Sequence, residues 1–427
     1  MSADAISRAQ LASLNQLLKA AVPANPFYTK KVLEAGVPTQ IPSLEEFTRS
    51  FPFTTKQEIA QDQLDHPPYG RNLTFPLEEY SRLHQTSGTT GKPLRWLDTP
   101  QTWDMLVDCW TEVYRTAGVT NKDICYFAFS FGPFLGFWLA FDAGGRIGCL
   151  CVPGGGQSSL ARLQTILDLR ATVLLCTPSY AIHLAEVAAQ ERIDLSKSQV
   201  RLIMVAGEAG GSIPATRQQI ERLWPGARVS DHHGMTEVGA VSYECPAKPC
   251  RLHVIDWAYY AEVLNPATQV AVPLGTPGEL VLTTLKRVGS PLLRYRTGDL
   301  VKLAAHHATD SRCACGAFNP TLEGGILGRT DDMVVVRGVN VYPSAIEQIV
   351  REFPDVAEYR AHVHKKGALA ELHLVIEPLQ KVRDAAALVA AIEKSLQAVL
   401  NLRVPVTIAP PGSLPRAELK ARRWIKD

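Results

Sequence analysis

The chain has 427 residues, of which 46% are hydrophobic and 20% charged, and its formal net charge is +2. This composition is typical of a globular enzyme with two or three domains. The small net charge gives no electrostatic reason to expect nucleic acid or an anionic membrane as a partner. The first residues carry Asp4 and helical periodicity rather than an apolar signal-peptide core, and no apolar run is long enough to span a membrane. We therefore expect a cytoplasmic protein.

The N-terminal half predicts helices followed by a parallel sheet. Residues 1–80 are expected to be helical and irregular, and Ser43 stands three positions before Glu46, a capping-box signal. From 100 to 240, helical patterns alternate with the apolar segments DICYFAFSF, RIGCLCVPG, ATVLLCTPS and VRLIMVAG. This alternation indicates βαβ units, whose ligands bind at the carboxyl ends of the strands.

The C-terminal half predicts two further regions. From 252 to 305, the segments HVIDWAYYAEVLNP, GELVLTTL and LLRYRTGDLVKLA alternate with period two, which favours an antiparallel sheet or small barrel. After GRTDDM come a strand VVVRG, a helix PSAIEQIVREF, strands near 358–376, a helix near 384–400 and a strand VPVTIAP. The expected fold class is α/β, with an N-terminal domain at 1–328 and a small α+β domain at 329–427.

The stretch HQTSGTTGKP, residues 84–93, indicates a phosphate-binding loop. Only two residues separate Gly88 from Gly91, and Pro93 follows Lys92, so the Walker pattern G-x-x-x-x-G-K-[ST] is not met. This disfavours a simple ATPase. Backbone amides, hydroxyls and Lys92 suit a polyphosphate, whereas a Ser/Thr/Gly surface turn is the alternative for the stretch taken alone.

Four more motifs follow in order, namely HHGMTEVG, YRTGDL, GRTDDMVVVRGVNVYP and LPRAELKARR. Together with TSGTTGKP, they resemble the adenylate-forming superfamily of acyl-CoA synthetases, adenylation domains and luciferases. The segment RGVNVYPSAIE resembles the corresponding segment of the phenylacetate–CoA ligase branch, which contains aryl-CoA ligases for phenylacetate-, benzoate- or anthranilate-type acids. The resemblance implies that ATP and an aromatic carboxylate give an acyl-adenylate and pyrophosphate, after which the thiol of coenzyme A displaces AMP.

The resemblance also implies an ATP site that uses Mg²⁺, because the first step crowds negative charge. The expected ATP-binding residues are Thr86, Ser87, Gly88, Thr89, Thr90, Gly91, Lys92, Gly207, Glu208, Ala209, Asp231, His232, His233, Asp299 and Arg329. The loop at 86–92 would hold the β- and γ-phosphates, while the segments around 207–209 and 231–233 would hold adenine. His233 stands where many relatives have tyrosine. Asp299, expected in a turn after a strand, would accept hydrogen bonds from the ribose with help from Arg329.

The expected catalytic residues are Lys420, Thr236 and Glu237. By resemblance, Thr236 contacts the α-phosphate, Glu237 ligates Mg²⁺, and Lys420 bridges the carboxylate and the α-phosphate. A capped helix N-terminus is the alternative for the MTE stretch. Leu419 replaces the glycine that relatives usually have before the lysine, and leucine takes a positive φ less easily. The resemblance also implies that Asp331 would be the hinge about which a mobile C-terminal domain rotates; a surface turn is the alternative.

The cysteines suggest a metal site, because nine is an odd count without a secretory signal, which argues against a disulfide framework. Five are expected to be buried apolar residues in a reducing compartment, namely Cys109, Cys125, Cys149, Cys151 and Cys176. The others gather in ECPAKPCRLHV and RCACG. Thiolates with one imidazole suit structural zinc, and similar relatives favour Cys245, His253, Cys313 and Cys315, with Cys250 as a spare. Free cysteines are the alternative.

The acyl pocket is expected where aromatic residues follow a core strand. Its candidate residues are Phe129, Phe131, Gly132, Phe134, Trp138, Ala206, Gly207, Gly234 and Met235. Some of these rings would serve the core instead. A single-ring aromatic acid is expected, but the acid itself stays open. So does the acceptor, since the same residues would serve a carrier-protein thiol or an amine. A non-catalytic nucleotide-binding paralogue is a third alternative, which the intact set of Thr236, Glu237, Asp299, Arg329 and Lys420 disfavours. Relatives are often dimers, so a homodimer is one expected assembly.

Overall fold

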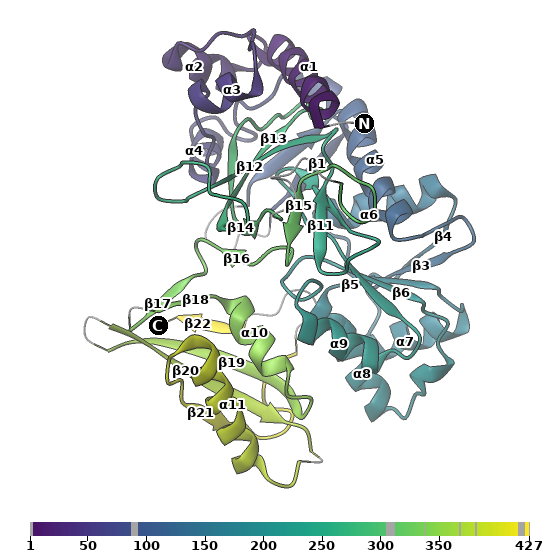
Figure 1. Ribbon diagram of the computed structural model, residues 1–427. Coiled ribbons are helices and arrows are strands. Elements are labelled where there is room, and N and C mark those ends of the chain that lie inside the picture. Colours follow the sequence, from purple (N-terminus) through teal and green to yellow (C-terminus); the bar gives the residue numbers. More distant parts are fainter. Residues whose placement is uncertain are drawn as a thin grey trace. The chain divides into compact units, whose positions relative to one another are not determined.

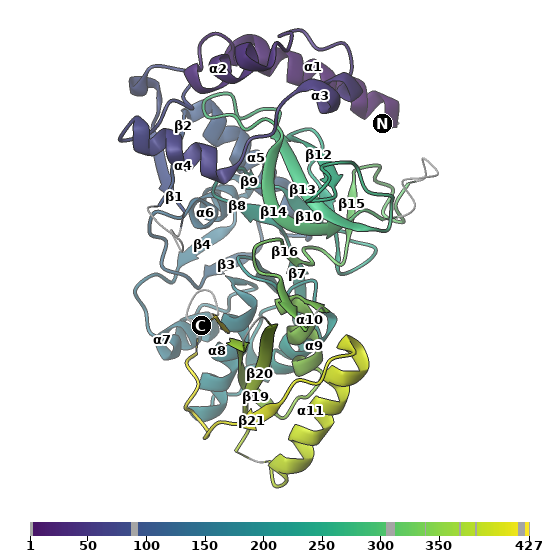
Figure 2. The same cartoon turned by 90° about the vertical axis from the view of Figure 1, so that its left-hand side faces the viewer.

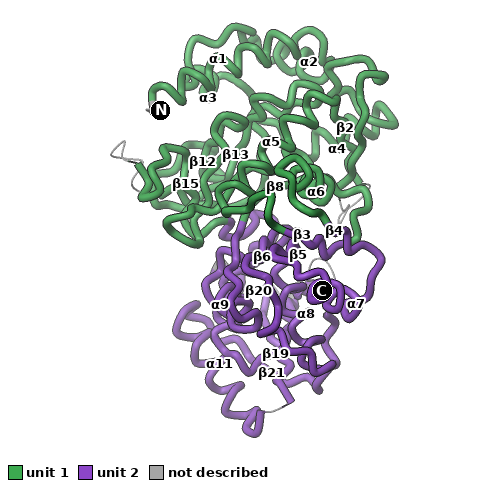
Figure 3. Tube along the Cα trace, turned by 90° about the vertical axis from the view of Figure 1, so that its right-hand side faces the viewer, with its two compact units in different colours: residues 1–123, 130–151, 232–325 green, residues 124–129, 152–231, 326–427 purple. Residues whose placement is uncertain are grey.

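The structure is a computed structural model that describes residues 3–86, 93–304, 312–337, 339–366, 369–380, 382–416 and 423–426. The described chain forms two compact units, shown in Figure 3. Unit 1 contains residues 1–123, 130–151 and 232–325, and unit 2 contains residues 124–129, 152–231 and 326–427. The parallel-sheet segment thus groups with the C-terminal residues, whereas the expected domains divide the chain once, near 329.

The N-terminal part of unit 1 is helical, as the sequence predicts (Figure 1). Its elements are α1 (Ala3–Ala21), α2 (Pro26–Ala35), α3 (Leu44–Ser50), α4 (Lys56–Asp65) and η1 (Leu77–Glu79). The Ser43 side chain accepts a hydrogen bond from the amide of Glu46 at the start of α3, which confirms the predicted cap. Buried side chains of these helices, such as Leu14, Tyr28 and Phe47, pack around Leu293 and so attach the helices to unit 1.

The rest of unit 1 combines two helices with short antiparallel sheets. The helices are α5 (Pro100–Thr116) and α6 (Leu135–Ile147). The strands are β1 (Arg82–Gln85), β2 (Arg95–Asp98), β8 (Gly234–Met235), β9 (Gly239–Ala240), β10 (Ser242–Glu244), β11 (Arg251–Val254), β12 (Tyr259–Leu264), β13 (Pro277–Thr284), β14 (Tyr295–Lys302) and β15 (Thr321–Glu323). Strands β12, β13 and β14 pair antiparallel, as predicted.

The parallel sheet of unit 2 has the order β4-β3-β5-β6-β7. Its strands are β3 (Ile124–Phe127), β4 (Leu150–Pro153), β5 (Val173–Cys176), β6 (Leu202–Val205) and β7 (Arg228–Asp231), and the linking elements are α7 (Ser159–Asp168), α8 (Pro178–Gln190), η2 (Leu195–Lys197) and α9 (Pro214–Leu223). The apolar segments thus form strands, but β4 begins later than the predicted segment RIGCLCVPG. Residues up to Ile147 stay in α6, which ends at Gly148 in the left-handed region with φ 92°.

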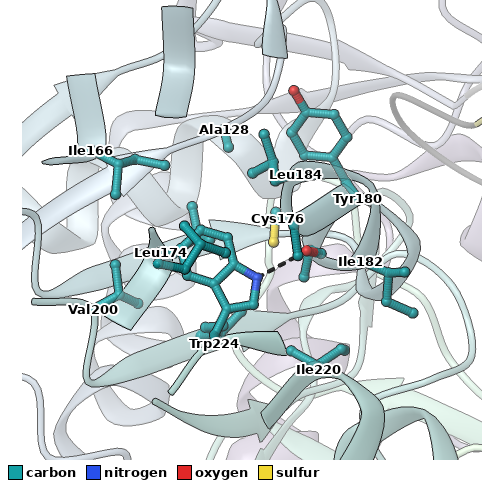
Figure 4. Packing of buried hydrophobic residues seen from close by; sticks show 14 of the residues in the cluster. Ala128, Ile166, Leu174, Cys176, Tyr180, Ile182, Leu184, Val200, Ile220 and Trp224 are labelled. Atoms are coloured by element: carbon teal, nitrogen blue, oxygen red, sulfur yellow. Dashed lines mark hydrogen bonds between the residues drawn. The ribbon is translucent and has the colours of Figure 1, made fainter. Parts of the chain in front are cut away.

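A buried apolar cluster fills unit 2 beneath these helices (Figure 4). Leu174 and Cys176 belong to strand β5 of the sheet, and Ile166, Tyr180 and Trp224 close the cluster from the helical side. The indole nitrogen of Trp224 donates a hydrogen bond of 2.9 Å to the carbonyl of Ala181, so the only polar atom of this ring is satisfied inside the core. This core fixes the carboxyl ends of β6 and β7, where candidate ligand-binding residues follow.

The C-terminal part of unit 2 is a sheet covered on one face by two helices (Figures 1 and 2). The elements are β17 (Val334–Val336), β18 (Val339–Val341), α10 (Pro343–Arg351), β19 (Val356–Lys366), β20 (Leu369–Pro378), α11 (Ala385–Leu400), β21 (Val406–Ile408) and β22 (Trp424–Lys426). The sheet has the order β18-β17-β20-β19-β22, with β21 paired to β20, and β16 (Gly328–Arg329) is not one of its strands. The sequence predicts all of these except β16, β18 and β22. Across the described residues, none of the helices combines the length and apolar character that a membrane crossing requires.

Candidate active site

The predicted phosphate loop joins the antiparallel strands β1 and β2, and Ser87, Gly88, Thr89, Thr90, Gly91 and Lys92 lie outside the described residues. Thr86 closes the strand end of this hairpin. Its amide donates to the Leu94 carbonyl at 3.0 Å, and its hydroxyl accepts from the Leu94 amide at 3.0 Å. The Thr86 hydroxyl can still donate its own proton to a ligand. The contact between Thr86 and ATP stays a prediction.

Thr236 and Glu237 lie in the turn between β8 and β9, so the alternative of a capped helix is wrong. Gly239 begins β9 directly after this turn with φ 96°, and a Cβ there would lie 2.4 Å from Leu106 Cδ2, so glycine is favoured at this position. The Glu237 carboxylate is almost fully buried and lies 3.2 Å from Lys56 Nζ. A buried carboxylate beside a hydroxyl is the oxygen-donor chemistry that Mg²⁺ prefers.

Lys56 was not identified from the sequence, although one signal was present. It occupies the first turn of α4, after the N-cap Thr55, where a positive charge opposes the helix dipole. Such an unfavourable position calls for a partner elsewhere, and the structure supplies Glu237.

His233 and Asp299 are brought together inside unit 1. His233 Nε2 lies 3.0 Å from Asp299 Oδ2, and both side chains are buried. Asp299 lies within β14 rather than in the predicted turn. It stands beside Gly298, whose φ is 76°, where the pairing of β13 with β14 shifts register. The neighbouring His232 ring packs edge-on against Trp110 of α5, with a centroid distance of 4.4 Å. The sequence identifies both members of the His233–Asp299 pair but not their contact.

Of the candidate adenine residues, Gly207, Glu208, Ala209 and Asp231 belong to unit 2 and lie at or just after the carboxyl ends of β6 and β7, where ligands are expected. Glu208 accepts hydrogen bonds from the amide and hydroxyl of Ser179 in the first turn of α8, which suits a carboxylate at a helix N-terminus. Asp231 accepts a 2.5 Å hydrogen bond from the Ser212 hydroxyl. Ala206, Gly207 and Ala209 complete the segment after β6, and the φ of 92° at Gly207 favours glycine there.

Arg329 and Asp331, predicted as a ribose contact and a hinge, form an ion pair with each other. The distances are 2.8 Å from Arg329 Nε to Asp331 Oδ1 and 3.1 Å from Nη2 to Oδ2. Asp331 is exposed, which is compatible with a dihedral change at this position.

Lys420 and Leu419 lie outside the described residues, but an arginine is anchored on each side of them. Arg416 binds both oxygens of Glu377, at 2.6 and 3.0 Å, and Glu186 at 2.9 Å. Arg423 binds both oxygens of Glu358, at 2.6 and 3.0 Å. These bidentate pairs fix both points from which the candidate catalytic segment departs.

The candidate acyl-pocket aromatics of unit 1 gather at the start of α6. Phe131 packs on Trp138 with a centroid distance of 4.9 Å, and Phe134 contacts Phe137 edge-on at 5.9 Å. The Trp138 indole nitrogen donates to the Gly132 carbonyl at 2.8 Å, yet 42% of Trp138 is exposed. Gly234 and Met235 form β8 of the same unit, whereas Phe129 belongs to unit 2 and packs on Phe127.

A second cluster has the geometry of a metal centre. One ligand atom each from Cys245, His253, Cys313 and Cys315 lies within 4.8 Å of the others. Cys245 Sγ is 3.6 Å from Cys313 Sγ, and Cys315 Sγ is 3.3 Å from His253 Nε2. The other ring nitrogen of His253 lies 3.2 Å from the Thr321 hydroxyl, which orients the imidazole.

This group is the one the sequence predicts, and Cys250 is not part of it. Of the five cysteines expected in the core, Cys151 is only half-buried and the other four are buried.

Comparisons of the sequence and of the structure with known proteins agree on the family. Residues 49–285 match the family described as AMP-binding enzyme, and residues 338–427 match its AMP-binding enzyme C-terminal domain. Phenylacetate-coenzyme A ligase of Thermus thermophilus is 32% identical, over 94% of this chain and 92% of its own length. The Pseudomonas putida phenylacetate-coenzyme A ligase is 30% identical, over 98% and 94%. A crystal structure of 2-hydroxyisobutyryl-CoA ligase in the postadenylation state with 2-HIB-AMP aligns with a TM-score of 0.93 and 30% identity, covering 100% of this chain and 90% of the other.

Proposed function

The chain belongs to the AMP-binding enzyme family and is an AMP-forming acyl-CoA ligase, and from this premise we propose that its acid is a single-ring aromatic carboxylate. The supporting observation is the aromatic group at the start of α6, where Phe131 and Trp138 pack together and Trp138 stays partly exposed. Flat apolar surfaces favour an aryl ring. The two phenylacetate-coenzyme A ligases support the same class of acid.

A panel of acids tests this proposal. We expect phenylacetate, benzoate or anthranilate to give kcat/KM at least about tenfold above 2-hydroxyisobutyrate, the acid of the aligned ligase, because a ring buries more apolar surface than a branched aliphatic acid. The measurement is CoA-dependent AMP formation with each acid at matched concentrations. A preference for 2-hydroxyisobutyrate would refute the aromatic assignment while leaving the ligase activity in place.

We assign the residue roles on the same basis. The Thr236 hydroxyl would contact the α-phosphate of ATP, and the Glu237 carboxylate would hold Mg²⁺, which would supply positive charge where negative charge accumulates. Asp299 accepts hydrogen bonds from the ribose hydroxyls, and His233 fixes the orientation of that carboxylate through its 3.0 Å contact. Lys420 supplies a positive charge between the carboxylate and the α-phosphate, and the loop at 86–92 binds the departing pyrophosphate. Asp331 serves as the hinge.

The cysteine–histidine cluster is proposed to hold a structural zinc ion. Three thiolates and one imidazole complete a tetrahedral set, which leaves no open position for catalysis. The cluster links β11 to the segment before β15, so a bound ion stabilises this part of unit 1. Metal analysis of the purified protein should give one zinc per chain, and Cys313→Ser should lower that content. A full zinc content in Cys313→Ser would show that the ion lies elsewhere.

The remaining predictions concern the surroundings of the enzyme. We propose CoA rather than a carrier protein as the acceptor, a homodimer as the assembly and the cytoplasm as the location. Light scattering tests the assembly, and a comparison of free CoA with a loaded carrier protein tests the acceptor.

A further inference from the structure

A fully buried arginine lies beside the turn between β8 and β9 that carries Thr236 and Glu237, which we call the catalytic turn. Neither the sequence motifs nor the proposed function assigns a role to this arginine. Arg287 follows β13, and its side chain and that of Asp98 are both 0% exposed. Arg287 Nε donates to Asp98 Oδ1 at 2.8 Å and Nη2 donates to Oδ2 at 2.6 Å. Its guanidinium carbon lies 5.6 Å from the centre of the Trp96 ring. Burying two charges is costly unless both are fully bonded, and here they are bonded to each other.

The third edge of the guanidinium reaches the catalytic turn. Arg287 Nη1 donates to the carbonyl of Glu237 at 2.6 Å and to the carbonyl of Thr236 at 3.2 Å. Nε and Nη2 bind the Asp98 carboxylate while Nη1 binds the two carbonyls of the catalytic turn. The planar guanidinium can do both because its N–H groups point in fixed, different directions. Lysine, with a single nitrogen, cannot reproduce this arrangement.

Asp98 connects this arrangement to β2, which follows the predicted phosphate loop at 86–92 in the sequence. Asp98 is the last residue of this strand. Asp98 Oδ1 also accepts from the Thr102 hydroxyl at 3.2 Å, and its carbonyl accepts from the amide of Ser81. The residues joined are far apart in the chain, 189 positions between Asp98 and Arg287 and 50 between Arg287 and Glu237.

We propose that Arg287, oriented by Asp98, is a positioning residue that sets the catalytic turn for binding ATP with Mg²⁺. This inference rests on the proposed roles of Thr236 and Glu237. Arg287 contacts the backbone of both residues, so it fixes the direction in which their side chains leave the turn. Groups that orient ligating residues in this way change affinity by about 10- to 100-fold when removed.

The test is Arg287→Lys, with Arg294→Lys as the matched control. Arg294 is also buried, binds both oxygens of Glu262 at 2.8 and 3.0 Å, and donates to a carbonyl, that of Phe51, at 2.7 Å. Both variants lose a bidentate pair, but only Arg287→Lys releases the turn. Calorimetric titration with MgATP, without acid or CoA, should show about a tenfold higher Kd for Arg287→Lys and an unchanged Kd for Arg294→Lys. Equal Kd values in both variants would overturn the inference.

A second variant covers the possibility that Arg287→Lys folds poorly. Replacing both partners, in Asp98→Leu/Arg287→Met, removes both buried charges, and such replacements are often tolerated. We expect Tm to recover relative to Arg287→Lys while the Kd for MgATP stays raised about tenfold, because the turn still lacks its donor. Wild-type Kd in the double variant would mean that the pair serves stability alone. Failure of the proposed function is separate, since wild-type protein would then bind MgATP without forming aryl-CoA.

Discussion

Single residues in the candidate ATP site are held by polar partners that the chain supplies from distant positions. Glu237 faces Lys56, and Asp299 faces His233, each at hydrogen-bond distance. A carboxylate held in this way has a defined direction before ATP arrives, which reduces the entropy lost on binding.

Asp299→Asn tests this at the ribose. The amide nitrogen of asparagine is a donor, so it cannot accept hydrogen bonds from the ribose hydroxyls as the carboxylate oxygen that it replaces can. Because hydrogen bonds to charged groups are worth about 1.5–3 kcal/mol, KM for ATP should rise by about 10- to 100-fold, with KM for CoA nearly unchanged. Steady-state kinetics measure both constants. An unchanged KM for ATP would contradict the role given to Asp299.

Asp256 gives a pH prediction that is independent of catalysis. Burial, together with the nearby Glu112, raises the pKa of Asp256 to about 6 from 3.8. The folded protein therefore holds this proton more tightly than the unfolded chain, so the contribution to stability falls as pH rises from 3.8 to about 6 and is constant above that. Asp256→Asn cannot ionise, so it should raise Tm at pH 7.5 more than at pH 4.5. The same change in Tm at both pH values would argue against ionisation of Asp256.

Among the elements, the last strand of the described chain is held next to β19 by a network of ion pairs, which we call the C-terminal ion-pair network. Arg423 precedes β22 and binds Glu358 of β19, while Arg351 of α10 binds Glu347 at 2.9 Å. Tyr359 donates its hydroxyl proton to Glu347 at 2.6 Å. One network therefore joins β19, α10 and the residue that precedes β22.

Acid should weaken the C-terminal ion-pair network over a defined pH range. Burial alone would raise the pKa of Glu347, but Arg423 and Arg351 outweigh it and lower the value to about 2 from 4.5. The stabilisation is therefore complete above pH 4.5 and is lost as pH falls toward 2. Glu347→Gln should be less stable than wild type at pH 6, and the gap in Tm should narrow at pH 3. A gap that stayed constant would exclude ionisation of Glu347 as the cause.

The sequence predicts much of the fold because the periodicity of hydrophobic residues and the apolar runs are local signals. The strands β3, β5 and β6 and the helices α10 and α11 follow from such runs. Strand β22 has three residues and depends on Arg423 and on pairing with β19, neither of which a local pattern reveals. Likewise, Asp299 and His233 could each be identified from a motif, but their contact spans 66 positions. Arg287 carries no motif, because its role depends on partners in two other segments.

At the scale of the whole molecule, two half-reactions must be served by one chain with a predicted hinge at Asp331. The cysteine–histidine cluster lies in unit 1, away in sequence from the C-terminal elements. If it holds structural zinc, removing the ion should lower Tm by several degrees and reduce both half-reactions together. Calorimetry before and after treatment with a chelator measures this. Loss of thioester formation with adenylate formation intact would instead indicate that the cluster acts in one step.

The central claim is that this chain couples ATP cleavage to AMP with the formation of an aryl-CoA thioester. The most direct measurement incubates the protein with ATP, Mg²⁺, CoA and phenylacetate or benzoate and quantifies nucleotides and thioesters by chromatography. We predict equal amounts of AMP and aryl-CoA, and a loss of about 10²-fold or more in the rate for Lys420→Ala, since that lysine supplies charge in the transition state. Formation of ADP, or AMP release that does not depend on an aromatic acid, would contradict the account.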